Sequence, residues 1–162
     1  MIAARDETRP AYRLVVALGI AGAVILVVGL AQFFHYEPPG QRTGARATIL
    51  GVFDYDARTG TLQGPNRDHF KTSEPFAARV DWSSLPGDTV VGARWFSGGF
   101  AMDAGGIGPA TARSLAESDR VVPVNLGDGR LPAGHYQFVV ERYAKNRPVE
   151  VLARVAVLVV GS

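Results

Sequence analysis

The sequence contains no cysteine, and it has only two methionines and three histidines among 162 residues. Without cysteine there is no disulfide framework and no thiolate metal site, so any domain of this chain depends on its core for stability. The formal net charge is only +2, and the 15 arginines and two lysines form no run. This pattern excludes the basic tracts typical of nucleic-acid-binding proteins.

Glycine and proline are abundant instead, with 19 and 10 copies, and both residues favour turns over long helices. A chain of this length accommodates one domain of roughly 100–200 residues or a smaller domain with an accessory segment. The composition therefore predicts a small domain of short strands joined by frequent turns.

One stretch without charge differs from the rest of the chain. Residues 14–34 carry a single polar side chain, that of Gln32. About 20 apolar residues at 1.5 Å each cross a bilayer core, and a crossing segment is helical because lipid offers its backbone no partner. The stretch predicts one N-terminal transmembrane helix and the lipid bilayer as a partner. Aromatic residues suited to the two membrane interfaces flank it: Tyr12, Phe33, Phe34 and Tyr36.

Small residues recur within this stretch at spacings that let two helices approach closely. They are Ala17, Gly19, Ala21, Gly22 and Ala23. The pattern indicates packing against helices of other membrane-protein subunits. Glycine and alanine are also common in transmembrane helices in general, which is the simpler interpretation.

A cleavable signal peptide is the alternative interpretation of the N-terminus. Three arginines precede the apolar run, and residues 29–31 are similar to a cleavage site that would leave Gln32 as the first residue. The apolar run is longer than the about 7–15 residues of a usual signal-peptide core. We therefore expect the helix to be retained.

The arginines ahead of the helix favour a cytoplasmic N-terminus under the positive-inside rule. The predicted organisation is a cytoplasmic tail at 1–13, a transmembrane helix at 14–34, a linker at 35–47 and an extracytoplasmic domain at 48–162. This organisation places the protein in the cell membrane with a single pass, and its C-terminal domain in the periplasm or outside the cell.

Apolar stretches of strand length fill the predicted outer domain. They lie at residues 48–55, 76–82, 89–96, 120–126, 136–141 and 149–160. Two of them, 76–82 and 136–141, alternate with the period of two that a half-buried strand requires. One short helix is expected at 110–118. Because strands and helices do not alternate, the pattern predicts an antiparallel β-sandwich.

A short segment before residue 137 carries a resemblance. Leu131, Gly134 and Tyr136, in the sequence LPAGHY ahead of an alternating strand, resemble the tyrosine corner of immunoglobulin-like and fibronectin type III-like sandwiches. With Trp82 and Trp95 upstream, the chain is similar to bacterial extracytoplasmic immunoglobulin-like domains of membrane-anchored proteins. The resemblance covers roughly residues 48–160 and implies that the hydroxyl of Tyr136 bonds to nearby backbone. It departs from the antibody pattern because the cysteine pair is absent, and it says little about function.

No catalytic or metal-binding constellation emerges from the spacing of the polar residues. His35, His69 and His135 are scattered, with no second partner nearby for a base or a metal. Asp54 and Asp56 weakly resemble the start of a calcium loop, which requires more oxygen ligands, so a solvated turn is favoured. We expect no enzyme activity, no metal and no cofactor.

Two apolar features are candidates for docking a partner. The glycine-rich segment 97–112 carries Phe100, Met102 and Ile107, and apolar side chains in an exposed loop mark partner sites. Alternatively, these three fold back over the edge of the sandwich. In the last strand, Leu158 and Val160 lie on a face that a lone sandwich would make polar.

These features together predict a non-catalytic, membrane-anchored accessory or structural subunit. Its helix would pack, and its outer β-domain would dock, in a larger membrane protein complex; a respiratory or photosynthetic complex is one candidate, with no motif behind it. Two alternatives are a free-standing extracytoplasmic ligand-binding or sensor domain and a metallochaperone-like assembly factor. A 13-residue tail leaves little room for signalling, and the chain has no methionine or histidine cluster.

Overall fold

The computed structural model describes Val16, Gly19, Ile20 and Gly22 together with residues 36–38, 40, 42–102, 105–124 and 129–161. The chain divides into two units, Met1–Tyr36 and Glu37–Ser162. The second unit contains all the strands of the described residues.

The predicted transmembrane helix is corrected by the structure. Across the described residues, no helix is long and apolar enough to cross a membrane. A crossing needs about 20 consecutive apolar helical residues, and only Val16, Gly19, Ile20 and Gly22 of the range 14–34 are described, all four as helical. The remainder of that prediction lies outside the described residues. The predicted fold class also contained a β-sandwich, and this part agrees with the described strands.

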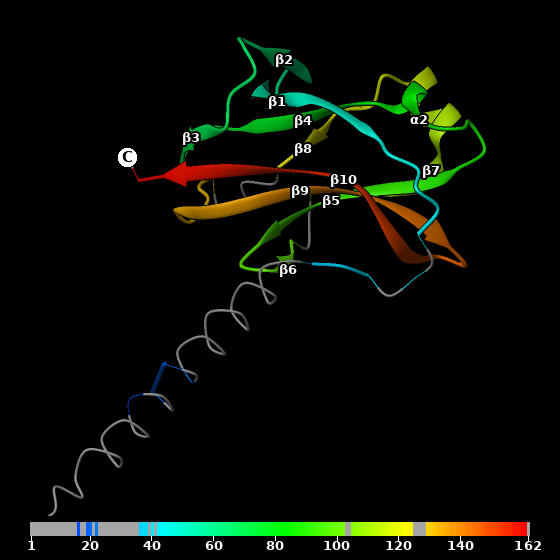
Figure 1. Ribbon diagram of the computed structural model, residues 1–162. Coiled ribbons are helices and arrows are strands. Elements are labelled where there is room, and N and C mark those ends of the chain that lie inside the picture. Colours follow the sequence, from blue (N-terminus) through cyan, green and yellow to red (C-terminus); the bar gives the residue numbers. More distant parts are fainter. Residues whose placement is uncertain are drawn as a thin grey trace, which may run out of the picture. The chain divides into compact units, whose positions relative to one another are not determined.

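Among the described residues, ten strands build the sandwich (Figure 1). They are β1 (Thr48–Asp56), β2 (Thr61–Gln63), β3 (His69–Lys71), β4 (Phe76–Asp81), β5 (Val90–Ser97), β6 (Phe100–Ala101), β7 (Ile107–Thr111), β8 (Val122–Pro123), β9 (Gly134–Ala144) and β10 (Arg147–Val160). A 3₁₀ turn, η1 (Trp82–Ser84), follows β4, and a short helix, α2 (Ala112–Glu117), follows β7. The predicted strands and the helix at 110–118 are thus present, with the stretch 120–126 reduced to β8.

The strands form two sheets that pack face to face. One has the order β2–β1–β4–β8, and the other has the order β3–β10–β9–β5–β6, with β7 paired to β5. Along the described strands the chain changes sheet five times: between β2 and β3, β3 and β4, β4 and β5, β7 and β8, and β8 and β9. All described pairs are antiparallel except β10 with β3, which is parallel. The prediction of a purely antiparallel sandwich is therefore corrected, because β3 and β10 are too far apart in sequence for a hairpin to set their direction.

The longest pairing is the hairpin of β9 and β10. Its turn consists of Lys145 and Asn146, whose φ angles of 51° and 60° suit the two-residue type I′ turn of tight hairpins. Register shifts follow Pro148 and Val151 in β10. They interrupt a strict alternation of buried and exposed residues along β10: Leu152, Val157 and Val159 are buried, whereas Val151 is only half-buried. A bulge places one extra residue in a strand, so the buried face changes its phase there.

Residues 42–47, which we call the strap, lie along β10 before the chain enters β1. The N–H of Ala47 donates to the carbonyl of Leu152 at 3.2 Å, and Thr43 bonds to the side chain of Glu150. The range 35–47 had been predicted as a linker; the structure places its residues from Glu37 onward in the same unit as the sandwich. The strap is thus held by one backbone bond to β10 and by the side chain of Glu150.

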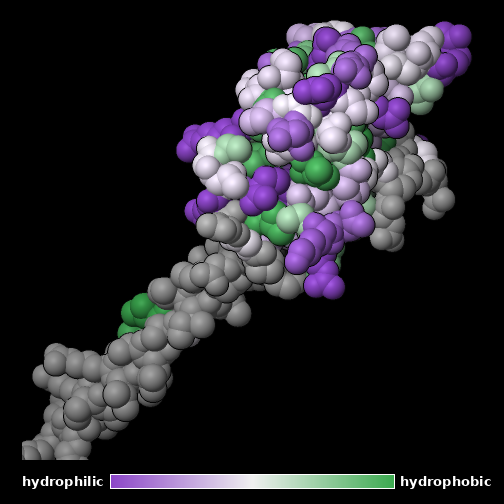
Figure 2. All heavy atoms as spheres, turned by 90° about the vertical axis from the view of Figure 1, so that its right-hand side faces the viewer, coloured by the Kyte–Doolittle hydropathy of each residue, from purple (hydrophilic) through white to green (hydrophobic). Residues whose placement is uncertain are grey.

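The core lies between the two sheets and consists mainly of apolar side chains. Rings fill one part of it: Phe70 stacks on Phe76 at 4.4 Å between centroids, and Trp95 meets Phe76 edge-on at 5.2 Å and Phe138 at 5.0 Å. On the face shown in Figure 2, small apolar areas alternate with polar ones over the described residues. Burying the rings between the sheets leaves the outer faces mixed, as expected for a sandwich exposed to water.

Candidate functional site

The corner before β9 has the bond that its sequence implies. The hydroxyl of Tyr136 donates to the carbonyl of Pro132, four residues upstream, at 2.8 Å. Leu131 is buried, and its N–H donates to the carbonyl of Thr72 at 2.7 Å. Gly134 has a φ angle of +155°, which side-chain-bearing residues rarely adopt. Burial raises the pKa of the Tyr136 phenol. The corner closes this end of the core, because Leu131 and Tyr136 are buried there and the hydroxyl is bonded to backbone.

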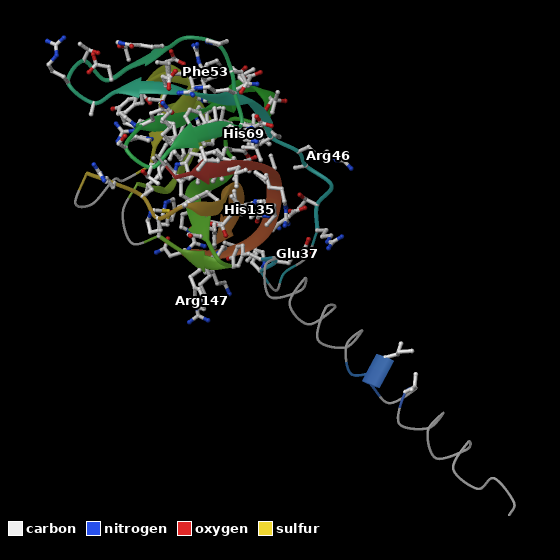
Figure 3. All side chains as sticks on the ribbon, turned by 90° about the vertical axis from the view of Figure 1, so that its left-hand side faces the viewer. Glu37, Arg46, Phe53, His69, His135 and Arg147 are labelled. Carbon is white, nitrogen blue, oxygen red and sulfur yellow. The ribbon has the colours of Figure 1, made fainter. Side chains whose placement is uncertain are left out.

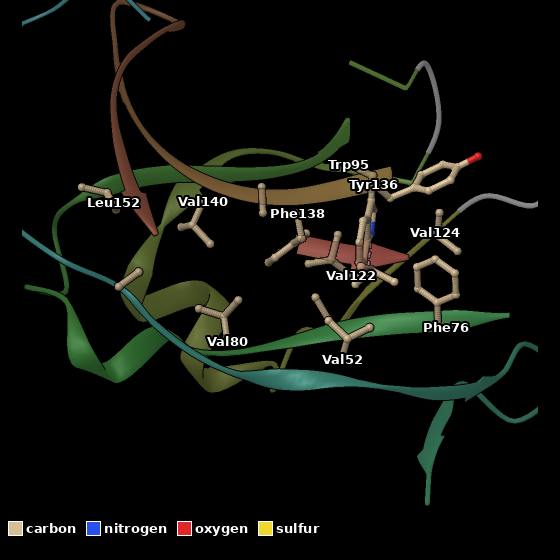
Figure 4. Close-up of a cluster of buried hydrophobic side chains, with 14 of the residues drawn as sticks. Val52, Phe76, Val80, Trp95, Val122, Val124, Tyr136, Phe138, Val140 and Leu152 are labelled. Carbon is tan, nitrogen blue, oxygen red and sulfur yellow. Dashed lines mark hydrogen bonds between the residues drawn. The ribbon is translucent and has the colours of Figure 1, made fainter. Parts of the chain in front are cut away.

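Figure 4 shows how this corner joins the aromatic part of the core, with Tyr136, Trp95 and Phe76 at one end of the cluster. The indole N–H of Trp95 donates to the carbonyl of Val122 at 3.1 Å, which ties β5 across the core to the short strand β8. A buried indole needs such a partner. The core is therefore filled by side chains at this end.

The five candidate docking residues are placed on different parts of the sandwich. Phe100 is 67% exposed in β6, at the edge of the larger sheet, and Val160 is 39% exposed at the end of β10. Met102 and Ile107 pack against the core, and the N–H of Met102 donates to the carbonyl of Trp95. Leu158 is half-buried. Strands β9 and β5 separate β10 from β6, so the five side chains do not form one patch.

The segment 97–112 is accordingly structured, with β6 and β7 pairing to both halves of β5. The segment is rich in glycine, and its sequence therefore did not predict these two strands. Gly106 explains part of the arrangement, because a side chain there would come within 3.0 Å of the carbonyl of Ala93.

Most of the predicted helix-packing and membrane-interface residues are not among the described residues. Tyr12, Phe33, Phe34, Ala17, Ala21, Ala23 and His35 lie outside the described residues. Tyr36 is half-buried, and Gly19 and Gly22 are exposed with no atom within 4 Å of the position of an added Cβ. Nothing in these placements brings the helix-packing or interface residues together.

The polar candidates form no reactive cluster. His69 bonds through Nδ1 to Asp68 at 2.6 Å, but the side chains are 62% and 76% exposed, and this pairing lowers the pKa of Asp68. His135 is exposed, as Figure 3 shows together with His69. Asp56 accepts from the backbone N–H of Arg58 at 2.9 Å, which lowers its pKa and makes it part of a turn. Among the described residues, no three His, Cys, Asp or Glu side chains could together hold a metal.

Two buried carboxylates were missed by the sequence reasoning. Glu141 is fully buried and receives two bonds from Arg94, at 2.7 and 2.9 Å. The hydroxyl of Tyr143 lies 3.4 Å from the same carboxylate, and burial, together with that negative charge, raises the pKa of Tyr143. The bonds from Arg94 to Glu141 tie β5 to β9.

Glu150 lies at the opposite end of the core from Tyr136. Its carboxylate accepts from Arg142 at 2.8 Å and from the N–H and hydroxyl of Thr43 at 2.7 Å each, with Gly44 at 3.3 Å. Burial disfavours the charged form, but these bonds outweigh burial and lower the pKa of Glu150 below its usual value. A single glutamate within an apolar strand, close to an arginine across a hairpin, is the signal that could have identified this pair.

No protein-family model matches this chain, and no curated protein or solved structure is significantly similar to it. The resemblance to immunoglobulin-like domains therefore stays a prediction, and function has to be argued from the geometry alone.

Proposed function

We propose that the sandwich is a non-catalytic docking module, which serves as an accessory or structural subunit of a protein complex. The observation that supports this proposal is the position of Phe100, which is 67% exposed on a two-residue strand at the edge of the larger sheet. An exposed aromatic side chain at a sheet edge offers an anchor for a partner protein, because aromatic residues are enriched in protein interfaces.

The described polar groups support the same proposal. The two buried carboxylates, Glu141 and Glu150, are paired with Arg94 and Arg142, and the pair of Asp68 and His69 is exposed. The predicted partnership with the lipid bilayer depended on a spanning helix, and the proposed function does not include it. The location of the domain outside the cytoplasm stays a prediction.

Phe100→Asp tests the docking function. An interfacial carboxylate without a partner costs several kcal/mol, whereas at an exposed site the change stays within about 0.5 kcal/mol. We expect the melting temperature of the full chain to be unchanged and the tagged chain, expressed in its natural host, to shift from a high-mass complex to its monomer position in size-exclusion chromatography. Val90→Asp, at a 39% exposed valine of β5, is the matched control and should leave the complex intact.

A lowered melting temperature in Phe100→Asp would mean that the ring supports the fold. An unchanged complex at unchanged stability would remove Phe100 from the interface and leave the proposal without its support.

A further inference from the structure

The edge of β10 opposite β9 is covered at its two ends and open between them. Near its start, the N–H of Ala47 in the strap donates to the carbonyl of Leu152 at 3.2 Å. Near its end, the N–H of Leu158 donates to the carbonyl of Asp68, ahead of β3, at 2.8 Å. At about 3.3 Å per residue, these two bonds are about 20 Å apart.

Two residues in this opening direct their backbone groups to the edge. Successive residues of an antiparallel strand direct N–H and C=O alternately to the two sides, so Arg154 and Ala156 share the side of Leu158. In the described part of the chain, no bond satisfies these four groups, and Ala156 is exposed. Such groups are a template for an added strand.

A cleft of about 420 Å³ lies over the first part of this edge. Its apolar walls include Ile49 and Leu50 of β1 and Leu152 and Val155 of β10. Leu50 is 48% exposed there. The cleft thus offers apolar contact to the side chains of a peptide that bonds to the edge.

The charge around the opening is positive. Arg46 lines the cleft and extends into solvent (Figure 3), and it has no ion-pair or hydrogen-bond partner in the described ranges. Arg154 bonds to Glu37 through Nη2 at 3.3 Å, and its Nη1 is buried without a partner. Glu37 is already shared with Arg42 at 2.6 Å.

We propose that this opening binds an extended acidic peptide segment of a partner protein, which adds to the edge of β10 and places a carboxylate on Arg46 and Arg154. This inference rests on the proposed docking function but uses a surface other than Phe100. Charge complementarity identifies the occupant, because Arg46 has no carboxylate partner in the described ranges and Arg154 shares its one carboxylate, Glu37, with Arg42, so both guanidinium groups favour a further carboxylate. A second copy of the chain is disfavoured, since pairing two β10 edges would bring the arginines of both copies together.

The test uses the full chain and a fluorescein-labelled peptide, acetyl-TVDVEVT-amide, in fluorescence anisotropy at low salt. We expect saturable binding, and at least a tenfold loss when both acids are replaced by lysine or when the peptide backbone is N-methylated. Arg46→Glu should also weaken binding at least tenfold, and the matched charge reversal Arg147→Glu, at an exposed site in β10, should change it less than twofold. Ala156→Pro removes one edge N–H and should weaken binding without removing a bond to β9.

Absence of binding at peptide concentrations up to about 1 mM would overturn the proposal. Equal binding of the N-methylated peptide would also overturn it, because the edge of β10 would then not bond to the peptide backbone. Equal binding of inorganic phosphate would overturn it as well and would indicate a site for free anions. Unchanged binding by Arg46→Glu, or by Ala156→Pro at unchanged melting temperature, would also overturn it. Failure here with a complex still lost in Phe100→Asp would leave the docking function standing. Peptide binding with a complex insensitive to Phe100→Asp would support the peptide site alone.

Discussion

At one end of the sandwich, the aromatic end, Phe76, Trp95 and Tyr136 fill the space between the sheets with rings (Figure 4). At the other end, which we call the aliphatic end, the smaller Val80, Val140 and Leu152 predominate, with the buried Trp82 just after β4. The aromatic end closes through ring contacts and the bond from Tyr136 to Pro132. The aliphatic end closes through Glu150, which joins Arg142 to the strap.

One core is thus closed by a phenol at one end and by a carboxylate at the other. The two groups ionise at opposite ends of the pH range. The aromatic end is expected to weaken in alkali and the aliphatic end in acid.

The largest effect is expected at the aromatic end from Trp95→Ala. The ring is 1% exposed, and its removal leaves a cavity and deprives the carbonyl of Val122 of its donor. Substitutions of this kind cost about 3–5 kcal/mol. Urea denaturation of the full chain measures the loss, with Val90→Ala at an exposed position of the same strand as control. A loss no larger than that of the control would show that rings do not close this end.

Glu150→Gln should have the next largest effect, at the aliphatic end. The side chains of Glu150 and Arg142 are 5% and 21% exposed, and the loss of a buried charge partner costs about 2–4 kcal/mol. Because the folded pKa lies below the usual value of 4.5, this contribution is complete above pH 4.5 and is lost as pH falls through the folded pKa.

The measurement for Glu150 is urea denaturation across an acid series. The variant should lose less stability than the wild type as pH falls below 4.5, while Glu117→Gln, at an exposed carboxylate of α2, should follow the wild type. Parallel acid curves for Glu150→Gln and the wild type would contradict the assignment of acid sensitivity to this end.

Tyr136→Phe should cost about 1 kcal/mol, the scale of one buried hydroxyl bond. Burial raises the pKa of Tyr136, so its contribution is complete below the unfolded value of 10.0 and is lost as pH rises through the folded pKa. The variant should therefore lose less stability in alkali, with part of the loss remaining because the pKa of Tyr143 is raised as well. Melting at neutral and alkaline pH, with Tyr55→Phe as control, checks this; a variant as stable as the wild type at neutral pH would refute the corner bond.

The smallest effect is expected from Arg79→Ala. The pair of Arg79 and Asp119 has a distance of 3.0 Å, but the side chains are 44% and 74% exposed, and such pairs contribute about 0.2–1 kcal/mol or less. The difference between this loss and that of Glu150→Gln, measured in the same denaturation series with and without added salt, isolates the effect of burial. A loss as large as that of Glu150→Gln would mean that exposure does not distinguish the two pairs.

The long strands were predictable because their apolar residues alternate or form continuous runs. Strands β1, β4, β5, β9 and β10 were all found in this way, and Tyr136 was found from the sequence around it. Strands β2, β3 and β6 have three residues or fewer, too short for a period to be visible.

The parts of the site that could not be predicted depend on contacts over long sequence distances. Thr43 and Glu150 are 107 residues apart, and no local pattern marks the strap as a partner of β10. The two register shifts in β10 also moved Leu152 into the core and Val151 out of it, which a strict period of two cannot anticipate.

The two-residue turn at Lys145 and Asn146 has a consequence for how the chain folds. It joins the two longest strands through a connection of two residues, so this hairpin forms its contacts at a low loop-closure cost. The contact of Thr43 with Glu150 joins residues 107 positions apart in sequence, so we expect it to form later. We therefore expect substitutions in the turn, such as Asn146→Val, to slow the folding rate, and Thr43→Ala to act mainly by accelerating unfolding.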